Sequence, residues 1–142
     1  MKKITTMLVA LLLCAIPPQV RADGQNHAET RCSNADLRGA YSFVASGTFG
    51  NAPFATAGRT TYDGRGNAEG VIQVSVDGGV TPRLDWSGTC TVDPVSCTAT
   101  KVANIPGFGA VQFFVTFADG FRELRFIATN PGATISGTAR KQ

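Results

Sequence analysis

Side chains that could carry out covalent or acid–base chemistry are few in this sequence. The chain of 142 residues has four cysteines and one histidine, His27. A hydrolytic triad needs a histidine base beside its nucleophile, but His27 stands in a polar stretch, residues 23–31, that has no helix or strand pattern. The nucleophile motifs Ser-x-x-Lys and Gly-x-Ser-x-Gly are also absent from the sequence. We therefore assign no catalytic residue.

Three carboxylic acids on expected strands, Glu69, Asp85 and Glu123, are the candidates for a cyclase- or isomerase-type barrel enzyme. Such an enzyme would hold an apolar substrate beside one buried acid whose pKa is raised for proton transfer. Each of the three has a basic neighbour in sequence or strand order, which fits an exposed, salt-bridged face better. The sequence thus favours a protein that is not an enzyme.

The cysteines indicate a disulfide rather than a metal site. Cys32, Cys90 and Cys97, taken with His27, match no zinc-binding spacing, so we expect neither a metal nor another cofactor. In an oxidising compartment two of the three would pair and one would stay free. Cys97 could pair with Cys90 across a local turn, or with Cys32 to tie the N-terminal segment to the sheet.

The first 22 residues have the features of a cleavable signal peptide. Lys2 and Lys3 precede an apolar run, residues 7–16, and Val20 and Ala22 suit a cleavage after Ala22. The run is shorter than the ~20 residues that span a bilayer. We therefore expect a signal peptide at 1–22, a flexible lead-in at 23–31 and a periplasmic or secreted protein without a membrane span.

Cleavage after Ala22 would also remove the net charge. The chain has 13 Lys and Arg against 10 Asp and Glu, and three of the basic residues, Lys2, Lys3 and Arg21, lie in the leader. Ten charges of each sign then remain. Nothing basic is left to indicate nucleic acid or an anionic membrane surface as a partner, and no protein partner is indicated.

The remaining residues, 32–142, have the pattern of one antiparallel domain. A short helical turn is expected at 33–37, where Ser33 and Asp36 have the spacing of a capping box. Strands should follow at about 40–48, 54–62, 68–76, 82–92, 97–103, 110–117, 121–129 and 133–140. The alternation is cleanest at 82–92, which places Trp86 and Cys90 on one face and Asp85 on the other.

Short connections require these strands to be sequential antiparallel neighbours. Closing eight of them into a cylinder removes both exposed edges. We therefore predict an all-β fold, an eight-stranded antiparallel up-and-down barrel, with a β-sandwich as the alternative. A barrel of the outer-membrane type is disfavoured, because residues such as Arg59, Asp85 and Lys101 would interrupt its lipid-facing rows.

The interior of such a barrel is either packed or able to hold one small ligand. Small residues recur on the expected strands: Ala45, Gly47, Ala55, Ala57, Gly58, Gly70, Gly88, Ala99 and Gly137. Packing of the nine phenylalanines around them is their simplest explanation. Our leading function hypothesis is nevertheless the binding of a small apolar ligand in the interior, contacted by Tyr41, Phe43, Trp86 and Phe113.

Loop phenylalanines raise a different hypothesis. Phe49, Phe54 and Phe108 stand among glycines and prolines, and exposed aromatics on loops are typical of contact sites. They could make the chain an envelope protein that meets a partner or host. We favour the interpretation that they plug the two barrel ends.

The stretch from Cys32 to Tyr41 resembles the entry to the calycin barrels, the lipocalin and avidin group. In that group a helical turn leads to a Gly-x-aromatic at the first strand, and Gly39 and Tyr41 stand at those positions. The resemblance implies a basic residue on the last strand, Arg140, packed over the aromatic ring of Tyr41.

Nearly all of residues 23–142 also resembles a group of small exported bacterial β-barrel proteins of unknown function. Five motifs carry the resemblance, at 37–41, 61–67, 88–92, 119–127 and 136–139. It implies that Cys32 pairs with Cys97 and that Cys90 is free. It implies no activity.

Overall fold

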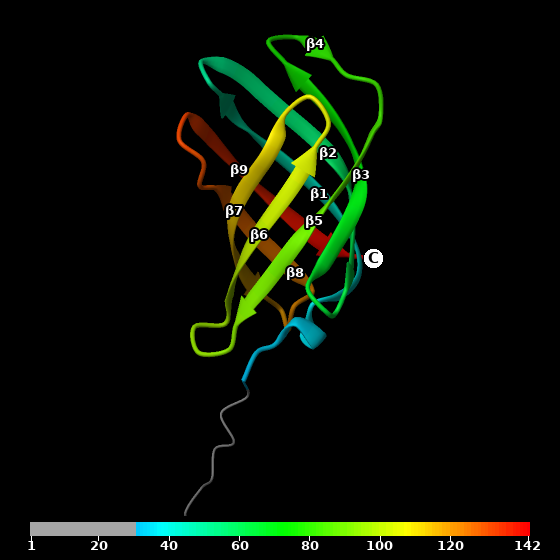
Figure 1. The fold of residues 1–142 in the computed structure, drawn as a ribbon, viewed down its shortest axis with the longest axis vertical. Coiled ribbons are helices and arrows are strands. Elements are labelled where there is room, and N and C mark those ends of the chain that lie inside the picture. The colour runs from blue at the N-terminus through cyan, green and yellow to red at the C-terminus, as the bar shows by residue number, and fades with distance from the viewer. Residues whose placement is uncertain (1–30) are drawn as a thin grey trace, which may run out of the picture.

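Apolar and polar residues alternate along most of the strands, and the resulting two-faced sheet is rolled into a closed barrel (Figure 1). The structure is a computed structural model that describes residues 31–142. The expected signal peptide and nearly all of the lead-in at 23–31 lie outside these residues. The elements in chain order are η1 (Asn34–Asp36), β1 (Arg38–Phe49), β2 (Ala52–Asp63), β3 (Asn67–Val76), β4 (Gly79–Val80), β5 (Leu84–Asp93), β6 (Thr98–Ile105), β7 (Gly109–Ala118), β8 (Glu123–Ala128) and β9 (Ala133–Lys141).

Eight strands form the wall, and each pairs antiparallel with its neighbours in the chain. The first and last strands, β1 and β9, then pair from Tyr41 opposite Lys141 to Phe49 opposite Ala133, which closes the sheet. The barrel prediction is confirmed, and the β-sandwich alternative is wrong. The two-residue strand β4 was not expected, and it only extends the end of β3.

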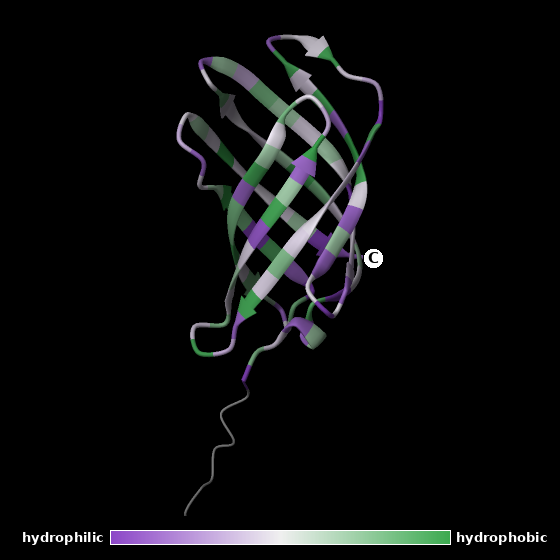
Figure 2. Cartoon of the chain, in the orientation of Figure 1, coloured by the Kyte–Doolittle hydropathy of each residue, from purple (hydrophilic) through white to green (hydrophobic). Residues whose placement is uncertain are grey.

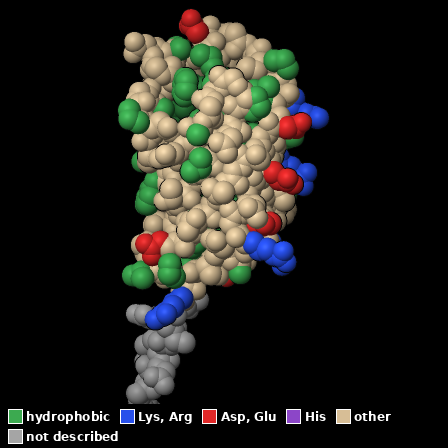
Figure 3. Space-filling model, in the orientation of Figure 1, with side chains coloured by type: hydrophobic (Ala, Val, Ile, Leu, Met, Phe, Trp, Pro, Cys, Tyr) green, Lys and Arg blue, Asp and Glu red, His purple; other side chains and the backbone are tan. Residues whose placement is uncertain are grey.

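The hydrophobic core fills the inside of the barrel. On β5, Trp86 and Cys90 are buried, whereas Asp85, Ser87 and Thr89, which alternate with the inward residues, are exposed. The same banding along the other strands is visible in Figure 2. The outer face seen in Figure 3 carries only scattered hydrophobic side chains, with charged ones gathered along one side. Among the described residues, no helix has both the length and the apolar character needed to cross a membrane.

Two phenylalanines explain part of the small-residue pattern. Phe43 on β1 lies opposite Gly58 on β2, and Phe126 on β8 lies opposite Gly137 on β9. A Cβ atom built on Gly58 would stand 2.8 Å from the Phe43 ring, and one on Gly137 would stand 2.6 Å from the Phe126 ring. These glycines therefore make room for inward rings, as the packing interpretation predicts.

The end of the barrel nearest η1 is closed by buried side chains. Leu37 and Tyr41 are almost inaccessible to solvent, and the Tyr41 hydroxyl donates a hydrogen bond of 2.6 Å to the Phe121 carbonyl. The helical turn is held by Asp36, whose carboxylate accepts hydrogen bonds from both the amide (2.8 Å) and the hydroxyl (2.9 Å) of Ser33. This end forms the floor of the barrel.

The basic residue over Tyr41 is not the one that the resemblance implies. The Lys141 ammonium lies 5.9 Å from the centre of the Tyr41 ring. Arg140 is exposed and faces Glu123, with 3.6 Å between its Nε and a carboxylate oxygen. Because successive side chains of a strand point to opposite faces, Arg140 and Lys141 cannot both face the ring.

A disulfide joins Cys32 to Cys97, with 5.3 Å between the two Cα atoms. The pairing implied by the resemblance is confirmed, and the alternative of Cys90 with Cys97 is wrong. Cys90 points into the barrel from β5, whereas Cys97 lies in the turn after that strand. The bond therefore ties the segment before η1 to the β5–β6 turn.

Removing this bond should lower stability substantially. The bridge spans 65 residues, and a loop of that length restricts the unfolded chain by about 4 kcal/mol in the chain-entropy model. We expect the double variant Cys32→Ser/Cys97→Ser to lose roughly that free energy of unfolding in urea denaturation. Cys90→Ala removes a thiol but no bridge and serves as the control. An unchanged denaturation midpoint for the double variant would contradict the prediction.

Candidate functional site

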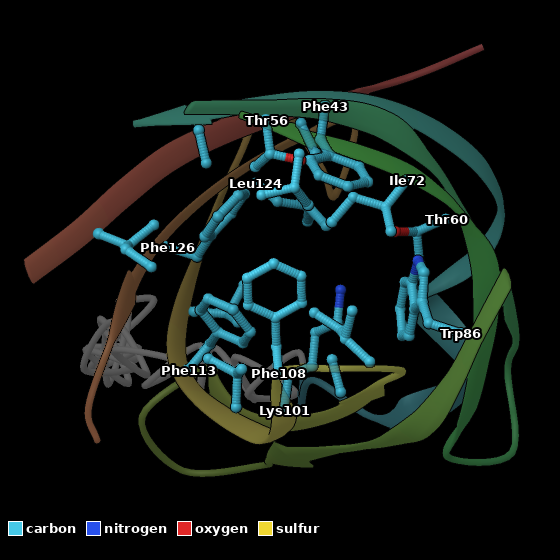
Figure 4. A pocket seen from close by; sticks show the side chains of 18 of the residues that line it. Phe43, Thr56, Thr60, Ile72, Trp86, Lys101, Phe108, Phe113, Leu124 and Phe126 are labelled. Atoms are coloured by element: carbon cyan, nitrogen blue, oxygen red, sulfur yellow. The ribbon is translucent and has the colours of Figure 1, made fainter. Parts of the chain in front are cut away.

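A cavity occupies the middle of the barrel and extends to the end opposite the floor (Figure 4). Its walls are almost wholly apolar, with aromatic side chains from β1, β5, β7 and β8: Phe43, Trp86, Phe113 and Phe126. Aliphatic residues such as Ile72, Val115 and Leu124 complete the lining. The only formal charge in the lining belongs to Lys101.

The cavity is narrow. The volume of the cavity is about 50 Å³. A single water needs roughly 10–15 Å³ on that measure. The space therefore suits a few waters or a thin chain, and a bulkier ligand would have to displace side chains.

Three phenylalanines partly cover the mouth of the cavity. Phe49 ends β1, Phe54 lies on β2, and Phe108 lies in the β6–β7 turn. The Phe108 ring centre is 5.8 Å from that of Phe49 and 6.4 Å from that of Phe54, and both pairs meet edge to face. The interpretation that these residues plug both barrel ends holds for one end only, because all three meet at the mouth and none lies at the floor. They could move apart to admit a ligand, because two hairpins contribute them.

Lys101 projects from β6 into the cavity, and Figure 4 shows its nitrogen near the centre of the ring of lining side chains. In the sheet register its neighbours are Cys90 on β5 and Phe113 on β7. The Nζ atom lies 4.4 Å from the centre of the Trp86 ring, 5.4 Å from that of Tyr62 and 5.9 Å from that of Phe113. These distances are typical of cation–π contacts.

The inward position of Lys101 corrects the sequence analysis, which placed it among residues that interrupt an outward row. Strand β6 reads Thr-Ala-Thr-Lys-Val-Ala-Asn-Ile, so it has no strong apolar alternation to set its phase. One signal was present. Lys101 lies four positions before Ile105, an even offset, so a buried Ile105 requires Lys101 to face the same side.

Burial changes the acid–base properties of this group. Loss of solvation lowers the pKa of the Lys101 ammonium to about 8, although the neighbouring Cys90 thiol acts in the opposite direction. Burial also raises the pKa of Cys90 to about 11 and raises the pKa of Tyr62 further above its usual range. Lys101 is only partly exposed, through the side that borders the cavity. At neutral pH the amine remains mostly protonated.

Other polar atoms in the lining are few. The Trp86 Nε1 atom is buried, and within residues 31–142 it has no hydrogen-bond partner. Thr60 is also buried and lines the cavity, and the Thr56 hydroxyl donates a hydrogen bond of 2.8 Å to the Gln73 carbonyl. The cavity thus offers donors to a ligand but carries no negative charge.

The structure brings together three of the four residues expected to contact a ligand. Phe43, Trp86 and Phe113 line the cavity. Tyr41 does not, because it is buried in the floor and its hydroxyl is used by the Phe121 carbonyl. The residue that sequence reasoning missed is Lys101.

The three candidate acids do not reach the cavity. Glu69 and Asp85 are exposed on the outer face, and Glu123 pairs there with Arg125 at 3.0 Å. None of these three acids can therefore act as a proton donor to a substrate inside the barrel. In the part of the chain that the structure describes, no three His, Cys, Asp or Glu side chains cluster in a way that could hold a metal ion.

Comparisons with known proteins relate this chain to designed barrels by fold alone. No protein-family model matches the chain, and no curated protein matches it. Among solved structures, the redesigned β-barrel mFAP1 bound to DFHBI aligns with a TM-score of 0.54 and 16% identity, over 76% of this chain and 97% of that chain. The redesigned barrel mFAP0 bound to DFHBI aligns with a TM-score of 0.52 and 16% identity, over 75% of this chain and 99% of that chain. EF1p2_mFAP2b bound to DFHBI aligns with a TM-score of 0.51 and 15% identity, over 75% of this chain and 94% of that chain.

Lys101 should titrate well below an ordinary lysine. Because its folded-state pKa of about 8 lies below the usual ~10.4, its ¹³Cε chemical shift should change with a midpoint near pH 8. The resonance is assigned by its loss in Lys101→Met. The depressed pKa also makes folding less favourable when the amine is charged, so wild-type stability should rise from pH 7 to 9 relative to that variant. A midpoint above pH 10 would contradict the buried environment.

Proposed function

We propose that this chain is an exported β-barrel protein that binds a small apolar ligand in the barrel interior. The observation that carries this proposal is the apolar cavity, which is floored at one end and covered only by three phenylalanines at the other. The interior of a closed eight-stranded barrel can be filled by side chains or can hold one small molecule, and the cavity found here supports the second possibility. Apolar burial would supply most of the binding free energy.

Further support comes from the site and from the fold. Ligand sites are concave and mostly apolar, with a few polar groups that set orientation, and this cavity has that composition. The redesigned barrels mFAP1 and mFAP0, and the structurally similar EF1p2_mFAP2b, are each described as bound to DFHBI. We propose Phe43, Trp86 and Phe113 as ligand contacts, with Tyr41 supporting the floor beneath them.

The other functions considered have less support. A docking surface for an envelope or host partner would need exposed loop aromatics, but Phe49, Phe54 and Phe108 pack against one another. A cyclase or isomerase would need an acid in the cavity, and the candidate acids lie outside it.

The proposal of export rests on the N-terminal sequence and the disulfide. Residues 1–22 have the order of charged, apolar and small residues that signal peptidase recognises. The disulfide between Cys32 and Cys97 fits an oxidising compartment, since thiols stay reduced in most cytosols. The resemblance to small exported bacterial barrels agrees with this location.

Ligand binding can be tested with 1,6-diphenylhexatriene, a neutral, rod-shaped apolar dye, by its fluorescence increase on transfer from water. We expect saturable binding by the wild-type protein. Ala103→Phe, which adds a ring to the cavity wall, should weaken it at least about tenfold. Asn104→Phe adds the same ring to the exposed face one residue away and should leave binding unchanged. Equal binding by both variants would exclude the interior as the site.

Export can be tested separately. When the full chain is produced in a bacterium with a periplasm, the protein recovered from the periplasmic fraction should have a mass that corresponds to a chain beginning at Asp23. Lys2→Glu/Lys3→Glu, which reverses the charge of the leader, should slow export and leave uncleaved chain in the cytoplasm. Uncleaved wild-type chain confined to the cytoplasm would contradict the proposal.

A further inference from the structure

The ammonium group of Lys101 has no negative partner inside the barrel. It takes part in no hydrogen bond or ion pair with any of residues 31–142. The three ion pairs found there all involve arginines, Arg122, Arg125 and Arg140, and are on the outer surface. Buried charges in proteins are ordinarily paired, because an isolated charge loses its hydration without compensation.

Aromatic rings compensate only part of this loss. The rings of Trp86, Tyr62 and Phe113 present their π electrons to the Nζ atom, and Trp86 is the nearest at 4.4 Å. Such contacts stabilise a cation but provide no hydrogen-bond acceptor for its three N–H donors. The lowered pKa of Lys101 agrees with this incomplete compensation.

We propose that the ligand of this barrel carries a carboxylate at the end of an unbranched apolar chain, and that the Lys101 ammonium binds the carboxylate. This inference rests on the proposed function and names the chemical class of its ligand. A carboxylate supplies both the negative charge and the acceptors that Lys101 lacks, in surroundings that strengthen the pairing.

The shape of the cavity selects the rest of the ligand. Lys101 lies deep in the barrel, directly opposite Cys90 in the register of β5 and β6, and Cys90 is buried beside the floor. A carboxylate at Lys101 would direct the apolar tail away from the floor toward Phe49, Phe54 and Phe108 at the mouth. Because the cavity is so narrow, a single methylene chain fits it better than a branched or polycyclic skeleton.

The affinity of the barrel for a carboxylate ligand should depend on pH only through the protonation of Lys101. The titratable groups that face Lys101 from the neighbouring strands are Cys90, Tyr62 and, at the floor, Tyr41, and burial raises the pKa of all three above its ordinary value. Cys90 and both tyrosines therefore stay neutral between pH 7 and 9, and a carboxylate stays ionised. Lys101 loses its proton over this range, so affinity for a carboxylate should fall about tenfold between pH 7 and 9.

The test compares two probes of equal chain length, decanoate and decanol, by their displacement of the rod-shaped dye 1,6-diphenylhexatriene. At pH 7 wild-type protein should prefer decanoate by roughly 10- to 100-fold, the range expected for a charge-assisted hydrogen bond. Lys101→Met, which keeps the length and apolar character of the side chain, should bind decanol as wild type does and lose the preference. Lys141→Met, which removes the exposed lysine of β9, should retain the preference for decanoate.

The outcomes separate this inference from the proposed function. Binding of diphenylhexatriene and decanol without any preference for decanoate would overturn the carboxylate assignment and leave interior binding intact. A preference that survives in Lys101→Met, or that is unchanged from pH 7 to 9, would also overturn it. Failure of all three probes to bind the wild-type protein would overturn both proposals.

Discussion

The backbone ladder between β1 and β9 is the interaction on which the rest of this structure depends. It joins the first and last strands of the barrel through nine residue pairs, from Tyr41–Lys141 to Phe49–Ala133. Without it the eight strands would form an open sheet with two exposed edges and a flat apolar face. Closure converts that face into an interior that is shielded from water on every side, and it places β1 and β8 close enough for Phe43 and Phe126 to meet edge to face.

The same closure gives Lys101 its unusual properties. Trp86, Tyr62 and Phe113 come from three different strands, and only a rolled sheet brings them around one ammonium group. Enclosure by apolar walls removes the water that would solvate the charge and so lowers its pKa to about 8. An apolar cavity with one unneutralised cation is a selective environment, because it favours ligands that combine an apolar body with a negative group.

Much of the fold could be predicted from local patterns. The turns rich in Gly, Asp and Asn separate eight alternating segments, and the short connections leave only an antiparallel meander. The inward set of β5, with Trp86 and Cys90, follows from a period of two. The facing of Lys101 was predicted wrongly because the period of two is weak on the Thr- and Ala-rich strand β6. The basic residue over Tyr41 was also predicted wrongly, because Arg140 and Lys141 are adjacent and only Lys141 faces the ring. In both places the side that a residue faces is set by neighbouring strands.

The sequence by itself determined the strands, their antiparallel order and the aromatic content of the interior, because alternation and turn residues act over a few positions of the chain. It also held the cysteine pair that ties Cys32 to the β5–β6 turn. Only the tertiary structure decided that Lys101 faces an apolar cavity, that Tyr41 belongs to its floor and that three phenylalanines cover its mouth. These features depend on strand register and on closure of the barrel, which bring together residues far apart in the chain. A local sequence pattern does not determine how well each side chain is solvated or which charged groups lie near it.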